Sequence, residues 1–113
     1  MANTIFSKII AREISADIVY EDEQCLAFRD ISPKAPFHVL LIPKKPIVNV
    51  ADASASDESL LGHLLLTAGA IAREHGHGEA FRVVTNNGAD AGQSVFHLHL
   101  HILAGRSFEW PPG

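Results

Sequence analysis

Three histidines occupy every second position of a short apolar segment near the end of the chain. Residues 96–103 place His97, His99 and His101 between Phe, Leu and Ile residues. Successive side chains of a β-strand point to opposite faces, so this spacing predicts three imidazoles on one surface and apolar side chains on the other. The chain has seven histidines in 113 residues. Random placement of that many gives such a triplet in roughly 3% of shuffled sequences, so the pattern indicates a functional surface.

Three neighbouring imidazoles suit two kinds of chemistry. Two histidines separated by one strand residue, together with a third, can bind zinc and leave its fourth position to water. Metal-free imidazoles can instead attack phosphorus, protonate a leaving group and stabilise charge on phosphate oxygens. A merely solvated strand face is a weaker interpretation, because three imidazoles that titrate near pH ~6.5 repel one another when charged.

The segment just before the histidines favours a phosphate ligand. It runs from Asn86 to Ser94, contains Gly88 and Gly92, and ends directly on the histidine segment. Backbone N–H groups of such a loop, together with the Ser94 hydroxyl, can converge on an anion without a basic surface. We therefore expect a phosphate beside His99.

Composition and charge narrow the class of protein. The chain has 113 residues, of which 47% are hydrophobic and 19% charged. These values predict one compact domain spanning residues 1–113. The net charge is −4 and there is no long basic run, so nucleic acid is not an expected partner.

The sequence also bears on compartment. The longest uncharged apolar run, residues 64–72, is far shorter than a membrane-spanning helix requires. The first residues do not resemble a secretory signal, so we expect a cytoplasmic protein that does not enter a membrane. Cys25 is the only cysteine, and we expect it to be a small apolar strand residue without a disulfide.

The apolar periodicity predicts an α+β fold. Helical spacing follows Thr4, which can cap a short helix, and Ser56, which can cap a longer helix that ends before Gly76 and Gly78. Five runs have strand character, at residues 18–21, 26–29, 37–42, 81–85 and 95–103. The order is thus α-β-β-β-α-β-β. Short connections favour a five-stranded antiparallel sheet with two helices packed on one face.

The histidine segment and its surroundings resemble one known family. His97-Leu98-His99-Leu100-His101, followed by two apolar residues, matches the pattern of the histidine triad (HIT) family. Matches to its histidine triad nucleotide-binding branch extend over nearly the whole chain, among them Phe6, Asp30-Ile31-Ser32-Pro33, Ile42-Pro43-Lys44-Lys45, Gly92-Gln93-Ser94 and Trp110-Pro111-Pro112-Gly113. The resemblance implies a HIT-like fold. It also implies a purine nucleoside phosphoramidase, an enzyme that hydrolyses P–N bonds.

The resemblance assigns catalytic roles to four histidines. It implies that His99 is the nucleophile and forms a transient nucleotidyl-histidine that water then hydrolyses. His101 would hold the phosphate and assist proton transfer, and His97 would orient the nucleophile through its other ring nitrogen. His38, on the predicted strand 37–42, resembles the fourth active-site histidine of the family. No metal or other cofactor is expected.

The resemblance also assigns substrate-binding residues. It implies that Asp30, beside Ile31, accepts hydrogen bonds from the ribose hydroxyls. A purine would occupy an apolar slot formed by Phe6, Ile9, Ile14, Phe28 and Leu40. The phosphate and the leaving group would be surrounded by Asn86, Gly92, Gln93 and Ser94. Trp110 would lie near the site of a partner subunit, so we expect a homodimer with joined sheets.

The expected substrates are purine nucleoside 5'-phosphoramidates, namely AMP or GMP conjugates of amines or lysine, and the product is the nucleoside monophosphate. Two alternatives remain. One is a zinc-dependent hydrolase whose metal ligands are His97, His99 and His101. The other is a nucleotide-binding module whose role is contact with other proteins. The chain departs from the family pattern at Pro46, where many members carry histidine.

Overall fold

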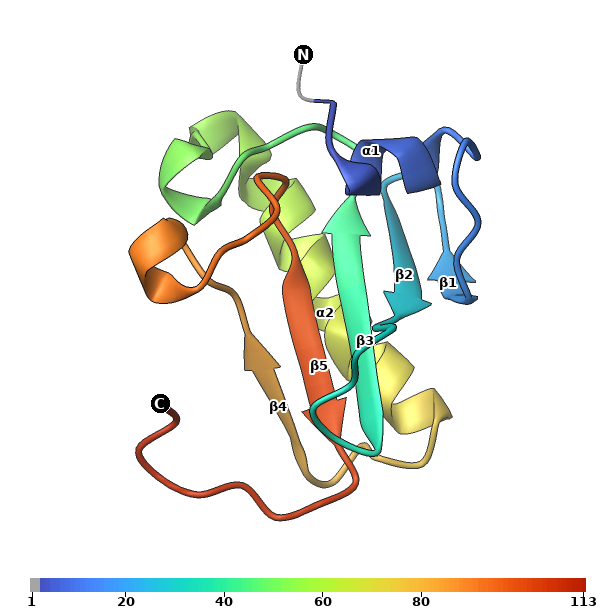
Figure 1. Cartoon of the computed structure of the whole chain (residues 1–113), viewed down its shortest axis with the longest axis vertical. Coiled ribbons are helices and arrows are strands. Elements are labelled where there is room, and N and C mark those ends of the chain that lie inside the picture. Colours follow the sequence, from blue (N-terminus) through green and yellow to red (C-terminus); the bar gives the residue numbers. More distant parts are fainter. Residues whose placement is uncertain (1–2) are drawn as a thin grey trace.

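The computed structural model describes residues 3–113 and confirms the predicted α+β class (Figure 1). The α-helices of this part of the chain are α1 (Ile5–Ile10) and α2 (Glu58–Glu74). Its strands are β1 (Ile18–Glu21), β2 (Cys25–Arg29), β3 (Phe37–Pro43), β4 (Phe81–Val84) and β5 (Leu100–Ala104). Short 3-10 helices, which the sequence analysis did not predict, are η1 (Val50–Asp52), η2 (Ala55–Asp57) and η3 (Ala89–Ala91). The order α-β-β-β-α-β-β is confirmed.

The strands form one antiparallel sheet in the order β1-β2-β3-β5-β4. The central pair, β3 and β5, joins residues that are far apart in the sequence. In this pair Leu40 lies opposite His101, and His38 lies opposite Leu103. Since side chains alternate along each strand, His38 and His101 project from the same face at diagonal positions. The sheet itself thus places two of the predicted catalytic histidines side by side.

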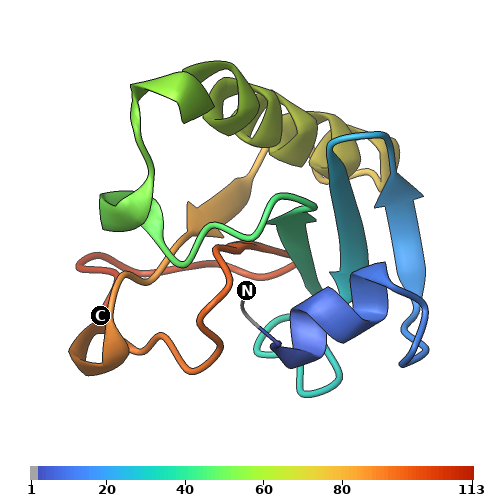
Figure 2. The same cartoon turned by 90° about the horizontal axis from the view of Figure 1, so that it is seen from above.

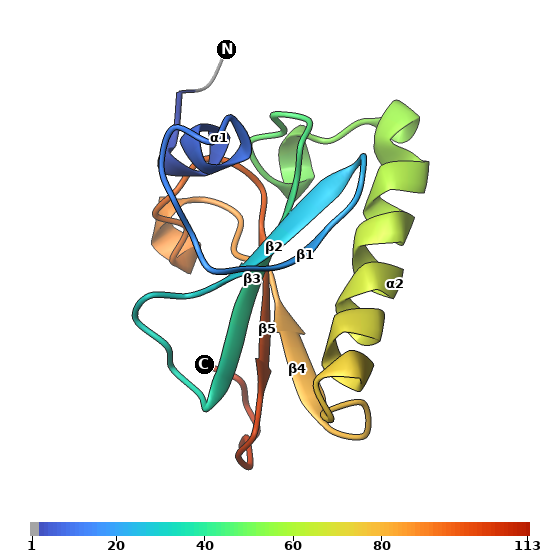
Figure 3. The same ribbon diagram turned by 90° about the vertical axis from the view of Figure 1, so that its right-hand side faces the viewer.

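The two α-helices cover opposite faces of the sheet, so the prediction that both pack on one face is wrong (Figure 2, Figure 3). The face toward α2 carries a core that includes Val39, Leu41, Leu64, Leu100 and Ile102. The opposite face carries a second core, formed by Phe6, Ile9, Leu26, Phe28, Leu40 and Ile42. Because the apolar side chains of β2 and β3 point to both faces, each face needs a cover, and α1 supplies the second one.

The start of α2 differs by one residue from the prediction. The cap of α2 is Asp57 rather than Ser56. The Asp57 carboxylate also accepts a hydrogen bond from the backbone N–H of Ser54 at 3.0 Å, which closes η2. The turn of η2 therefore leads directly into α2, and Ser56 lies inside it.

The end of α2 follows the glycine signal in part. Gly76 has a φ of 83°, and the N–H of His77 donates to the carbonyl of Ala72, which is a common closure of a helix. Gly78 is not in the left-handed region; a Cβ there would lie 2.6 Å from Cγ of Arg73.

Among residues 3–113, the helices are all too short or too polar to cross a membrane.

The histidine segment is a strand only in its second half. A strand was predicted over residues 95–103, but β5 begins at Leu100. The preceding residues lie beside the chain that leaves β3 at Pro43, which has no N–H group with which to continue the ladder. The N–H of Leu98 instead donates to the carbonyl of Ile47 at 2.7 Å.

The predicted alternation of apolar residues therefore fails at its first position. Leu98, Leu100 and Ile102 belong to the core under α2, as expected. Phe96 is 46% exposed instead of sharing that face, because the bend that precedes β5 breaks the strand geometry.

Candidate active site

The ring of His99 is fixed by one of its two nitrogens. Its Nδ1 lies 2.8 Å from the carbonyl oxygen of His97. A carbonyl can only accept a hydrogen bond, so Nδ1 of the neutral ring carries the proton and Nε2 carries the lone pair. The hydroxyl of Thr85 donates to the carbonyl of His99 and holds its backbone. The structure thus presents a buried imidazole whose Nε2 is chemically able to attack phosphorus.

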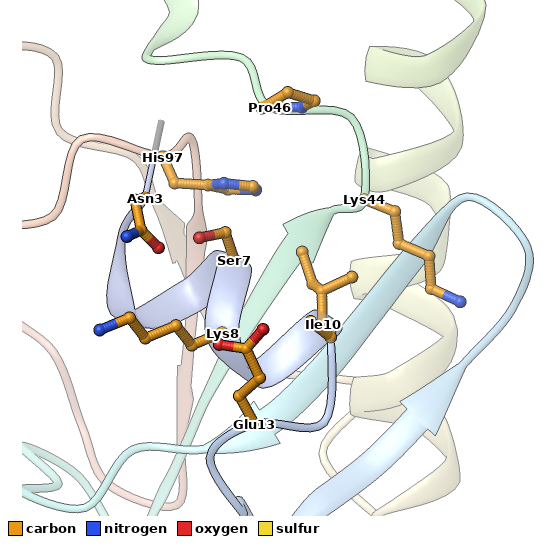
Figure 4. Close-up of a pocket in the computed structure, with 9 residues that line it drawn as sticks. Asn3, Ser7, Lys8, Ile10, Glu13, Lys44, Pro46 and His97 are labelled. Carbon is orange, nitrogen blue, oxygen red and sulfur yellow. The ribbon is translucent and has the colours of Figure 1, made fainter. Parts of the chain in front are cut away.

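His97 contacts the other ring nitrogen of His99 with its backbone carbonyl and not with its own ring. The irregular path before β5 turns the His97 ring toward the end of β3, where Nε2 lies 2.7 Å from the carbonyl oxygen of Pro43. Nδ1 of His97 is buried and has no hydrogen-bond partner in residues 3–113. The His97 ring lines a cavity of about 330 Å³, together with Ser7 and Pro46 (Figure 4).

A chain of hydrogen bonds assigns the protons of His38 and His101. The backbone N–H of Lys34 donates to Nδ1 of His38 at 3.0 Å, so this nitrogen carries no proton. Nε2 of His38 is therefore the protonated nitrogen, and it lies 3.0 Å from Nδ1 of His101 and 3.5 Å from the Asp30 carboxylate. Since Nδ1 of His101 accepts, the proton of neutral His101 is on Nε2. The ring centroids of His99 and His101 are 5.1 Å apart, so the N–H donor of His101 lies next to the His99 ring.

Burial keeps the four histidines neutral near pH 7. It lowers the pKa of His38, His97 and His99 below the ordinary value of 6.5, because the protein interior disfavours the charged ring. For His101, burial first and then the charges of His99 and His38 lower the pKa to about 4. The negative charge of Asp30 raises the pKa of His38, His99 and His101, but burial outweighs it. The cluster therefore avoids the repulsion of charged imidazoles.

An apolar cavity of about 460 Å³ adjoins the histidines. It is lined by every residue that the resemblance assigned to the nucleoside, namely Phe6, Ile9, Ile14, Phe28, Leu40, Asp30 and Ile31. The ring of Phe6 joins the cavity to His99, because it packs edge-on against that imidazole with centroids 5.0 Å apart. Ile31 is fully exposed at 100%, which places it at the rim. Ser15 and Ala16 also line the cavity and were not predicted.

The loop from Asn86 to Ser94, called the glycine loop below, differs from the prediction at Gln93. Gly88 and Gly92 have φ values of 94° and 103° and flank η3. The buried amide of Gln93 accepts from the N–H of Gly88 and donates to the carbonyls of Val48 and Val95. Because these bonds use both donors of the amide, the Gln93 side chain shapes the loop and is not available to a phosphate. Ser94 is exposed, with its backbone in the same loop.

Asn86 and Trp110 lie close together in space, away from the apolar cavity. Both line a shallow cavity along β4 with Arg82 and Thr85. Trp110 is 83% exposed and is not among the residues that line the apolar cavity under α1. The Asn86 side chain also contacts the glycine loop, since a Cβ on Gly92 would lie 3.5 Å from its Nδ2. Within one chain, Asn86 thus lies near Gly92 of the glycine loop, and Trp110 does not.

A comparison with protein families agrees with this geometry. The model of the HIT domain matches residues 11–108 of the chain. The chain belongs to the HIT family. Relatives cover nearly its whole length: an uncharacterized HIT-like protein of Synechocystis is 64% identical over 98% of this chain and 97% of the relative. A 14 kDa zinc-binding protein of Zea mays is 48% identical over 97% of this chain and 88% of the relative.

Solved structures of other HIT proteins share the fold. A HIT family hydrolase from Legionella pneumophila has a TM-score of 0.96 and 46% identity, and the match covers 98% of this chain and 100% of that one. A histidine triad nucleotide-binding protein from Candida albicans has a TM-score of 0.83 and 29% identity, with 96% and 83% covered. This HIT protein therefore has the fold of a nucleotide-binding hydrolase.

Three contacts that position the histidines of this HIT protein were not predicted from the sequence. They are the N–H of Lys34 on His38, the carbonyl of Pro43 on His97, and the hydroxyl of Thr85 on the carbonyl of His99. Two of the three are backbone groups, which are shared by nearly all residue types. Residue identity therefore carried no signal for them.

Proposed function

We propose that this HIT protein hydrolyses the P–N bond of purine nucleoside 5'-phosphoramidates and releases the nucleoside monophosphate. The observation that carries the proposal is the state of His99. Its Nδ1–H is bonded to the His97 carbonyl, so Nε2 is a nucleophile, and its ring lies against Phe6 of the apolar cavity. A nucleotide whose base occupies that cavity would have its 5'-phosphorus near this ring.

The reaction then takes two balanced steps. Nε2 of His99 attacks phosphorus, the P–N bond breaks, and the leaving amine takes the proton from Nε2 of His101. The positive charge of the nucleotidyl-His99 offsets the negative charge left on the His101 ring until water returns a proton. Water next attacks the nucleotidyl-His99 and gives a proton back to His101, and the N–P bond to His99 breaks. His38 holds Nδ1 of His101 throughout with its own Nε2–H, which fixes the nitrogen that carries the exchanged proton.

The cavity supports the substrate class. Its apolar lining from α1, β2 and β3 suits the faces of a purine, and Phe6 and Phe28 pack edge-on with ring centroids 5.5 Å apart. Its lining residues include two carboxylates, Asp17 and Asp30. The Oδ1 atom of Asp30 already accepts from the N–H of Ser32 at 2.8 Å, which orients the carboxylate for the ribose hydroxyls.

The zinc-dependent alternative has a different ligand set from the one expected. Among residues 3–113, the active-site groups whose ligand atoms lie within 4.8 Å of one another are Asp30, His38 and His101. The His97 ring instead bonds to Pro43, and His99 bonds to a backbone carbonyl. The Zea mays relative is named a zinc-binding protein, so the experiment on function includes removal and return of zinc.

We also propose a homodimer joined through β4. This strand pairs only with β5 inside the sheet, so its outer edge has unpaired backbone groups. The exposed Trp110 and the C-terminal segment lie along β4. Light scattering after size-exclusion chromatography should give twice the mass of the chain. A mass of one chain at micromolar concentration would contradict the dimer.

Hydrolysis of adenosine 5'-phosphoramidate by metal-stripped protein in excess chelator tests the function. We expect turnover that survives chelation and is lost in His99→Ala. Turnover that is lost on stripping and restored by zinc would favour the zinc-dependent hydrolase. AMP binding without turnover in either protein would favour the nucleotide-binding module.

A further inference from the structure

A second group of ligand-type side chains lies on the face of the sheet toward α2, away from the histidine triad. Asp22 is in the turn between β1 and β2, Cys25 is the first residue of β2, and His63 is in the first half of α2. Their ligand atoms all lie within 4.8 Å of one another. Cys25 belongs to the core under α2, whereas the active-site cavity belongs to the face under α1.

The spacing of these atoms is close to that of a metal site. Sγ of Cys25 lies 3.4 Å from Oδ1 of Asp22, and Nε2 of His63 lies 2.7 Å from Oδ2 of Asp22. A tetrahedral zinc ion holds sulfur and oxygen ligands about 3.5 Å apart, and nitrogen and oxygen ligands about 3.3 Å apart. The contact of Cys25 with Oδ1 already has this separation. His63 contacts the other carboxylate oxygen, Oδ2, so its side chain must turn away from Oδ2 to share an ion held by Sγ and Oδ1.

The carboxylate is held in place for such a role. Oδ1 of Asp22 accepts hydrogen bonds from the backbone N–H groups of Gln24 and Cys25, at 2.8 and 2.9 Å. Oδ2 accepts from the hydroxyl of Tyr20 at 2.8 Å. Contacts of this kind orient metal ligands in known sites. Burial raises the pKa of Asp22, but its hydrogen bonds outweigh burial, so the net effect is a lowered pKa.

The site is also open to an ion from solvent. Cys25 is fully buried, but the side chains of Asp22 and His63 are 27% and 33% exposed. An ion can thus reach Sγ past the other two ligands. Thr67, one turn after His63, has its hydroxyl 3.5 Å from Nε2 of His63 and can bond to a water on the metal.

We propose that Asp22, Cys25 and His63 bind a zinc ion, with water as the fourth ligand, and that the ion fastens the β1–β2 turn to α2. Sulfur, nitrogen and oxygen ligands together favour zinc over magnesium or calcium. Binding replaces the thiol proton of Cys25, which passes to solvent, and replaces the hydrogen bond between His63 and Asp22. The ion has no role in hydrolysis, since the site lies on the other face of the sheet.

Cobalt substitution tests this site, because a thiolate bound to Co²⁺ gives an absorption band that imidazole and carboxylate ligands do not give. Chelator-stripped full-length protein is titrated with Co²⁺ and, separately, with Zn²⁺ while its thermal unfolding is followed. We expect one equivalent of Co²⁺ with the thiolate band, and a higher melting temperature with Zn²⁺. Absence of the thiolate band in the wild-type protein would overturn the proposal.

Matched variants separate this site from the triad. Cys25→Ser should lose the band, and His63→Gln, which keeps a hydrogen-bonding group for Asp22, should weaken Co²⁺ binding by at least about tenfold. His75→Gln, at the end of the same helix, and His101→Ala, in the active site, should keep the band. Equal Co²⁺ affinity in His63→Gln and His75→Gln would refute the assignment. Phosphoramidate turnover should be the same in the His63→Gln and wild-type proteins, so failure of one proposal leaves the other standing.

Discussion

Nδ1 of His99 lies 2.8 Å from the carbonyl oxygen of His97, the residue two positions earlier in the chain. This contact decides the tautomer of His99 and therefore which nitrogen carries the lone pair. The contact requires the irregular segment before β5, because a regular strand directs its carbonyls sideways to a neighbouring strand. The bend directs this carbonyl to a side chain instead.

The proton donor can be tested with leaving groups of different acidity. His101→Asn should lower kcat/KM about 10²- to 10⁴-fold for an alkylamine phosphoramidate, because that amine must be protonated to leave. The loss should be much smaller for a nucleotide ester with an acidic phenol as leaving group, since a phenolate leaves without a proton. Equal losses for both substrates, measured in steady-state assays, would contradict the role of His101 as an acid.

The pH profile should reflect the lowered pKa of His99. Only its neutral form attacks, and burial lowers its pKa below 6.5. The kcat/KM for a phenol ester should therefore hold constant as the pH falls to 6.5, and decrease only at lower pH. A flat profile, or a decrease that begins above pH 7, would be inconsistent with a buried histidine nucleophile.

Stability should also depend on pH, through His101. Its pKa is about 4 in the folded protein against 6.5 for an ordinary histidine. Between these values the unfolded chain binds a proton that the folded chain does not, so the free energy of unfolding decreases as the pH falls through this window. Above pH 6.5 this histidine adds no pH dependence. Thermal unfolding should show a shallower decrease for His101→Asn than for the wild-type protein, and identical slopes would refute the assignment.

Phe6 should contribute to both stability and substrate binding. It is 5% exposed, packs against Phe28 and contacts His99. Phe6→Ala should lower the free energy of unfolding by about 3 kcal/mol and raise KM for the nucleotide. Ile5→Ala is the control on the same helix: Ile5 is 48% exposed, so its unfolding free energy should change by less than about 1 kcal/mol. Urea unfolding curves give both values, and equal losses in the two variants would contradict the packing described.

The sequence predicted the elements better than it predicted the contacts between them. Period-two spacing identified the second half of the histidine segment, because its burial alternates with residue type. A continuous apolar run that ends at Pro43 identified β3. It did not reveal the break before Leu100, which depends on Pro43 of a different strand. Nor did it reveal that α1 covers the second face, because the strand runs of β2 and β3 are apolar on both sides.

The candidate site shows the same division. The predicted nucleoside residues line one cavity because their types are apolar and the resemblance fixed their positions. The bond from His97 to Pro43 and the use of the Gln93 amide inside its loop depend on three-dimensional proximity to backbone groups. Spacing along the chain carries no trace of such proximity.

The most direct test of the central claim is to trap the covalent intermediate on His99. His101→Asn protein is mixed with a nucleotide ester that has an acidic phenol leaving group, which allows attack but slows the water step. The mixture is then quenched in alkali and digested for peptide mass spectrometry. We predict one nucleoside monophosphoryl group on His99, and none when His99→Ala is added to the variant. Turnover without an adduct, or an adduct on another residue, would contradict the account.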